Sequence, residues 1–152
     1  MYTMILEINE SRKFIFISTK NNVTYQFTSR CTYMFNETYN GFTYVFEVYE
    51  ESKESDDSFS LILLEMENET DLKVVDLYPD SSKYYLGKGI SISLLLKCRE
   101  IFGKRIISSS NLKKSDNYCE WNTPEAIDKV WNPLVKSGKA IYDQDEDLYV
   151  VI

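Results

Sequence analysis

Apolar and polar residues alternate through much of the first 67 residues, a period that predicts β-strands with one buried face. The alternation is clearest in residues 42–49 and 59–67, and shorter runs occupy residues 4–8, 13–18 and 23–27. The sequence NESR between the first two short runs indicates a hairpin turn. Residues 31–40 have no clean period, and we interpret them as an irregular connection that ends in the turn Asn40-Gly41. The acidic stretch 50–57 predicts a solvated loop.

The pattern changes after residue 70, where it predicts a strand over 71–79 and a helix over 90–102 that Gly103 ends. A strand at 104–109 completes a β-α-β unit, which favours a parallel strand pair. Thr123 and Pro124 then open a second helix, in which Pro133 favours a kink, and residues 139–151 form a closing hairpin. We therefore predict one α+β domain with a mixed sheet over residues 1–152. Its β-rich part covers residues 1–58, and its β-α-β-α-β-β part covers residues 59–152.

Charge and composition exclude several classes of function. The net charge is −7 and the basic residues cluster only in pairs, so we expect no nucleic-acid binding. The chain has no histidine, and Cys31, Cys98 and Cys119 are widely spaced, so we expect free thiols and no metal site. Neither a secretory signal nor an apolar run long enough for a membrane span is visible, which predicts a cytoplasmic protein without a membrane partner.

The loop before the helix at residue 90 is a candidate anion site. It contains Gly87 and Gly89, two of the five glycines in the chain. The N–H groups in the first turn of a helix have no intrahelical acceptor, and the helix dipole attracts anions. The small residues Ser91 and Ser93 would also let a phosphate approach the backbone. The pattern favours a pyrophosphate cradle over an ordinary strand-to-helix turn.

Residues 86–91, LGKGIS, resemble the acyl-CoA-binding signature of the GNAT N-acetyltransferase superfamily, Arg/Gln-x-x-Gly-x-Gly/Ala, commonly seen as RGKGIG. Four of these six residues match that common form, and the order of predicted elements from residue 59 to the end is similar as well. Leu86 stands where the family prefers Arg or Gln, and Ser91 stands where it prefers Gly or Ala. The two helices that usually follow the family's first strand are not visible in the N-terminal part.

The resemblance implies a GNAT-like domain that binds acetyl-CoA and transfers the acetyl group to the amine of a small molecule or peptide. It assigns the coenzyme to the loop and to the strand before it, at Leu77, Leu86, Gly87, Lys88, Gly89, Ile90 and Ser91. Direct transfer requires a base for the amine and an acid for the leaving thiolate. The candidate bases are Glu65, Glu67 and Asp76, and the candidate acids are Tyr118 and Tyr142.

Three other interpretations remain open. The departures at Leu86 and Ser91 favour a non-catalytic GNAT-fold binding or interaction protein, with phage-encoded and host-modulating proteins as examples. A DNA-mimicking acidic surface is a second alternative, although the acids have no regular helical spacing. A dinucleotide-binding or P-loop fold is a third, but Ile92 replaces the third glycine of GxGxxG and no GxxxxGK[ST] is present.

Overall fold

The computed structural model describes residues 4–53, 58–79, 83–114 and 120–152. In chain order its strands are β1 (Ser11–Lys20), β2 (Val23–Asn36), β3 (Gly41–Tyr49), β4 (Phe59–Glu65), β5 (Asp71–Pro79), β6 (Arg105–Ile107), β7 (Ala140–Asp143) and β8 (Leu148–Val151). Its main helix is α1 (Ile90–Phe102), and a second helical stretch consists of α2 (Pro124–Ala126), the π-helix η3 (Ile127–Trp131) and α3 (Asn132–Lys136). Two 3-10 turns, η1 (Glu51–Lys53) and η2 (Lys83–Tyr85), flank the sheet.

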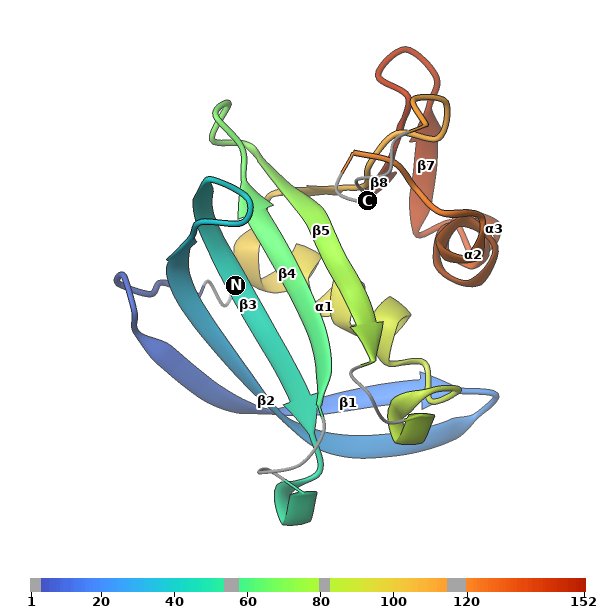
Figure 1. Ribbon diagram of the computed structural model, residues 1–152. Helices are drawn as coiled ribbons and strands as arrows, with labels where there is room; N and C mark the ends of the chain where they lie inside the picture. Colours follow the sequence, from blue (N-terminus) through green and yellow to red (C-terminus); the bar gives the residue numbers. More distant parts are fainter. Residues whose placement is uncertain (1–3, 54–57, 80–82, 115–119) are drawn as a thin grey trace.

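The strands form one eight-stranded sheet in the order β1-β2-β3-β4-β5-β6-β8-β7. All neighbouring pairs are antiparallel except β5 and β6, which are parallel and connected through α1. The predicted mixed α+β class and the predicted β-α-β unit are therefore confirmed. Helix α1 lies against one face of the sheet, and β1 and β2 curl around towards it (Figure 1).

A layer of buried side chains lies between α1 and this face of the sheet. Cys31, Phe46 and Leu61 form one row across β2, β3 and β4, and all three are fully buried. Leu94 and Leu95 of α1 are fully buried against the same core. Each such side chain contributes about 1.5–3 kcal/mol when it leaves water, so this layer supplies much of the stability of the fold.

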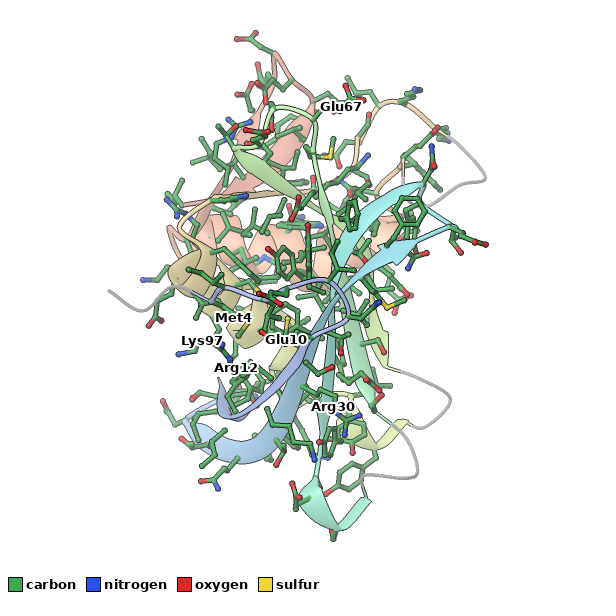
Figure 2. The ribbon with its side chains drawn as sticks, turned by 90° about the vertical axis from the view of Figure 1, so that its left-hand side faces the viewer. Met4, Glu10, Arg12, Arg30, Glu67 and Lys97 are labelled. Atoms are coloured by element: carbon green, nitrogen blue, oxygen red, sulfur yellow. The ribbon has the colours of Figure 1, made fainter. Side chains whose placement is uncertain are left out.

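Two predictions for the N-terminal part are wrong. Residues 4–8 do not pair with residues 13–18, because the Met4 N–H donates instead to the Ile101 carbonyl of α1, at 3.1 Å. Figure 2 shows Met4 beside Lys97 of the same helix. The first hairpin is formed by β1 and β2, whose turn residues Asn21 and Asn22 both have positive φ. A turn of this kind suits the twist of the two strands, and Asn tolerates its backbone angles.

Residues 31–40 are the second wrong prediction, because β2 continues to Asn36. The rings of Tyr33 and Phe35 each pack against Phe42 of β3, with centroids 5.6 and 5.4 Å apart. Cross-strand contacts between aromatic rings stabilise a sheet without requiring strict polar alternation. The predicted turn before Gly41 is confirmed, since β3 begins at that residue.

The predictions for α1 and for the second helical stretch are confirmed. Helix α1 spans residues 90–102 as predicted, and Gly103 ends it with a φ of 63°. Thr123 caps the second helical stretch, because its hydroxyl accepts the Ala126 N–H at 3.2 Å. Pro133 has no N–H to donate to the Lys129 carbonyl, and the helix takes π geometry directly before it, with the Asn132 N–H bonded to the Ile127 carbonyl.

Candidate functional site

The candidate site is a cleft that opens where β5 and β6 separate. The two strands pair only over residues 71–73 and 105–107. After Ile107 the chain no longer pairs with β5. The Ser108 N–H donates instead to the Tyr149 carbonyl of β8, at 3.0 Å. The space between β5 and the C-terminal part holds a pocket of about 490 Å³. A pocket of this size is typical of small-molecule sites.

The two walls of the cleft come from different parts of the chain. One wall consists of β5, the β4 residue Phe59 and the loop and helix residues Leu86 and Ser91. The other wall consists of Ser109, the segment 121–123 and residues of α2 and η3. The full lining is Phe59, Val74, Val75, Asp76, Leu77, Leu86, Ser91, Ser109, Trp121, Asn122, Thr123, Glu125, Ala126, Lys129, Val130 and Trp131. In Figure 1 these walls are β5 and the α2–α3 stretch, on either side of the split.

The helical wall is fixed from behind by aromatic stacking. Trp131 is buried, and its ring is parallel to that of Tyr149 on β8, with centroids 5.5 Å apart and planes 7° apart. The Tyr149 hydroxyl in turn accepts from the Asn111 side-chain amide at 3.2 Å. Such a stack contributes about 0.5–1.5 kcal/mol beyond the burial of its area. The wall is therefore attached to the hairpin of β7 and β8.

Asp76 is the only one of the predicted catalytic residues described here that lines the cleft. Its register places it opposite Ile62 of β4, and Val75 beside it forms a bulge in the β4–β5 ladder. The side chain is half-buried, and one of its oxygens, Oδ1, is buried without a hydrogen-bond partner among the described residues. Burial raises the pKa of Asp76 to about 6, although the Leu77 N–H acts in the opposite direction. A carboxylate with this pKa is mostly ionised at neutral pH and can still accept a proton.

The other candidate bases lie away from the cleft. Glu65 is at the end of β4, where it interacts with Tyr33 and Tyr44 on the face of the sheet that α1 covers. Burial, together with the hydrogen bond to Glu65, raises the pKa of Tyr33 to about 12. Glu67 is exposed in the turn between β4 and β5, at the end of the molecule labelled in Figure 2. Neither carboxylate is among the residues that line the cleft.

The candidate acids do not enter the cleft either. The Tyr142 hydroxyl bonds to the Asp147 carboxylate, and its ring packs on Tyr149. The hydrogen bond to Asp147 raises the pKa of Tyr142 to about 12, which makes it a poor proton donor at neutral pH. Asp147 also holds the backbone N–H groups of Asn111 and Leu112, so this cluster stabilises a loop. Tyr118 lies outside the described residues.

The glycine loop adjoins the cleft but faces it only in part. Of the predicted coenzyme residues, Leu77, Leu86 and Ser91 line the cleft, whereas Gly87, Lys88, Gly89 and Ile90 do not. Gly89 is the N-cap of α1, and its carbonyl accepts the first helical bond from the Ser93 N–H at 3.1 Å. The N–H groups of the three residues between them have no acceptor within the helix. The loop therefore has the donors that an anion site requires.

Strand β1 supports this loop from the opposite side. A Cβ atom at Gly89 would lie 2.6 Å from the Thr19 carbonyl oxygen, whereas one at Gly87 would meet nothing within 4 Å. The Ser18 hydroxyl donates to the Lys88 carbonyl at 2.9 Å. The glycine at position 89 is thus explained by the close approach of β1. Its presence alone is not a sign of a ligand.

Sequence reasoning missed most of the second wall. Asn122 and Ser109 are both buried. Ser109 ends the predicted strand 104–109, and Asn122 lies in the polar stretch after it, to which the pattern assigned no helix or strand. Trp121 and Trp131 are the two tryptophans of the chain, and both line the cleft. The occurrence of both tryptophans within ten residues is a sequence signal that could have indicated this wall.

Within the residues that the structure describes, no group of three or more Cys, Asp or Glu side chains is placed to hold a metal ion. In the same part of the chain, no helix has the length and apolar character that crossing a bilayer requires. Comparison with known proteins found no matching family model, no similar curated protein and no similar solved structure.

Proposed function

We propose that the cleft binds acetyl-CoA and that the protein is a GNAT-like N-acyltransferase, which transfers the acetyl group to an amine. The observation that carries this proposal is the separation of β5 from β6 beside the glycine loop, with the ionisable Asp76 in the wall. The element order from β4 to β8 and the sheet order β4-β5-β6-β8-β7 support the GNAT-like organisation.

The residues present suit the parts of the coenzyme. The first-turn N–H groups of α1 would bind the pyrophosphate without a side-chain charge. The separated edge of β5, residues 74–77, would pair with the amides of the pantetheine arm. The Oδ1 of Asp76 is buried without a hydrogen-bond partner in the described part of the chain. This oxygen and the largely apolar lining fit a thioester and an amine brought together away from water.

Asp76 would act as the base. In the reaction the ammonium group of the acceptor loses one proton to the Asp76 carboxylate, and the free amine then forms a bond to the acetyl carbon. The carbon–sulfur bond breaks, and the second proton of the nitrogen leaves with the thiol. General-base catalysis of this kind contributes roughly 10²–10⁴-fold to the rate. The acidic balance of the chain, with a net charge of −7, favours a cationic acceptor.

A second candidate function is a binding protein with this fold and without catalysis. No tyrosine is among the described residues that line the cleft, so neither of the predicted acids is seen beside the leaving thiolate. Leu86, which is half exposed, also replaces the polar residue that the GNAT signature prefers. These two observations favour binding without turnover.

Calorimetry and thermal melting with acetyl-CoA test the proposal. At a concentration about a hundredfold above Kd, the coenzyme should stabilise the protein by about 2.7 kcal/mol, which raises Tm by roughly 5–10 °C. Absence of binding at millimolar acetyl-CoA would overturn it. Binding without transfer to any of a panel of amines would leave the second candidate.

The base is tested with Asp76→Asn and the matched control Glu67→Gln. The first should lower kcat by roughly 10²-fold without changing the Kd for acetyl-CoA, and the second should change neither. Equal activity of both variants would remove Asp76 from the mechanism.

A further inference from the structure

Asn122 is buried at the point where β5 and β6 separate, and its side chain bonds to both backbone groups of Ser109. Its Oδ1 accepts the Ser109 N–H at 3.1 Å, and its Nδ2 donates to the Ser109 carbonyl at 2.7 Å. A neighbouring strand makes this same pair of bonds to one residue in a β-ladder. The amide of Asn122 therefore takes the place of a strand.

The missing strand is β5. The Arg105 N–H donates to the Thr70 carbonyl at 3.2 Å, so alternate residues of β6 present their backbone groups to β5. A continued ladder would also present Ser109 to β5, but the pairing stops at Ile107. A buried backbone group without a partner costs about 1–3 kcal/mol, so two strands do not separate inside a protein unless something else satisfies them.

Asn122 is itself held in place by its surroundings. Its Nδ2 also lies 3.1 Å from the Ser108 hydroxyl and 2.8 Å from Oδ1 of Asn111. Its own N–H donates to the Ser110 carbonyl at 2.7 Å. Both Asn122 and Ser109 line the cleft. The side chain that replaces the strand is therefore also part of the cleft wall.

We propose that Asn122 is a positioning residue that keeps the cleft open by replacing β5 as the hydrogen-bonding neighbour of Ser109. This role concerns the width of the cleft and applies whatever ligand the cleft accepts. Without the Asn122 amide, the Ser109 carbonyl keeps the Ser108 hydroxyl, which donates to it at 2.7 Å, but the Ser109 N–H loses the Asn122 acceptor. That N–H then gains most by pairing with the nearest strand edge. The parallel ladder would then extend, and the walls would approach the spacing of paired strands, about 4.8 Å.

The first measurement is hydrogen exchange at single amides. In Asn122→Ala the Ser109 amide should exchange about tenfold faster than in the wild type, because it loses one hydrogen bond. The Ser108 amide, bonded to Tyr149, should change less. Asn111→Ala is the matched control. It removes one partner of the Asn122 side-chain amide and leaves both bonds between Asn122 and Ser109 intact.

The second measurement separates a positioning role from a merely structural one. Spin labels at Leu86→Cys and Lys129→Cys, on opposite walls, report the width of the cleft by pulsed electron paramagnetic resonance. The background is Cys119→Ser, because the other two thiols are buried. Asn122→Ala and Asn122→Asp should both shorten the distance between the labels, whereas Asn111→Ala should not.

An unchanged label distance in both Asn122 variants would overturn the proposal, even where exchange at Ser109 accelerates. If neither variant folds, hydrogen exchange at the Ser109 and Ser108 amides of the wild-type protein tests the proposal. Protection of Ser109 equal to that of Ser108 supports the proposal, and exchange as fast as that of an unprotected loop amide overturns it.

Discussion

The two halves of the sheet differ in the length of their strand pairing. From β1 to β5 the ladders are long, and β1 and β2 alone match ten residue pairs. From β5 to β7 they are short, with three pairs between β5 and β6 and two between β6 and β8. The long ladders enclose α1 and the main core, whereas the short ones leave room for the cleft. Continuity of pairing gives stability, and its interruption gives a place for a ligand.

The comparison predicts that the largest losses of stability come from the continuous half. Leu94→Ala removes a fully buried side chain of α1 and should lower the free energy of unfolding by about 3 kcal/mol. Leu112→Ala, at a position 79% exposed, is the control and should change it by less than about 0.5 kcal/mol. Urea denaturation measures both values. Similar losses in the two variants would contradict the assignment of the core.

The contact between β1 and the glycine loop is tested at Gly89 and Gly87. Gly89→Ala forces a Cβ against the Thr19 carbonyl and requires a positive φ, so it should cost about 2–3 kcal/mol. Gly87→Ala shares the positive φ but has open space, and should cost only about 1 kcal/mol. Thermal melting of the two variants compares them directly. A smaller loss at position 89 would mean that β1 does not support the loop.

The short β5–β6 ladder is reinforced by an ion pair. Arg105 donates to both carboxylate oxygens of Asp71, at 2.8 and 3.0 Å, and this hydrogen bonding lowers the pKa of Asp71 below its usual value. A carboxylate with a lowered pKa stabilises the folded state at neutral pH and loses that contribution as the pH falls through the folded pKa. Arg105→Gln should therefore cost about 1–2 kcal/mol at pH 7. The difference should shrink below pH 3.8, the ordinary value for Asp; a constant difference down to acid pH would contradict it.

Asp76 should show the opposite pH dependence. Its pKa is raised from 3.8 to about 6 by burial, so the folded state favours the protonated form and loses stability as the pH rises through this range. At this half-buried site, Asp76→Asn should be more stable than the wild type by about 1 kcal/mol above pH 6, and the gain should disappear below about pH 4. Denaturation midpoints across this range measure it. A gain that does not depend on pH would mean that Asp76 is not desolvated.

Local sequence patterns predicted the elements whose pattern agrees with their surroundings. The alternation in residues 42–49 and 59–67 predicted β3 and β4, the second of which ends at Glu65, because each strand has one face on the core. The 3.6-residue period of residues 90–102 and the glycine after them likewise predicted α1 and its end. Residues 31–36 were not predicted as a strand, since the apolar Met34 lies on the face opposite Tyr33 and Phe35 and obscures the alternation.

The sequence alone determined the mixed α+β class, the β-α-β unit and the glycine loop before α1, because periodicity, caps and glycines act over a few residues. Only the tertiary structure decided that β5 and β6 separate after three pairs, that Asn122 replaces a strand and that Asp76 lies in the wall of the cleft. These features depend on residues distant in the sequence, and no local pattern records which backbone groups a buried side chain will satisfy.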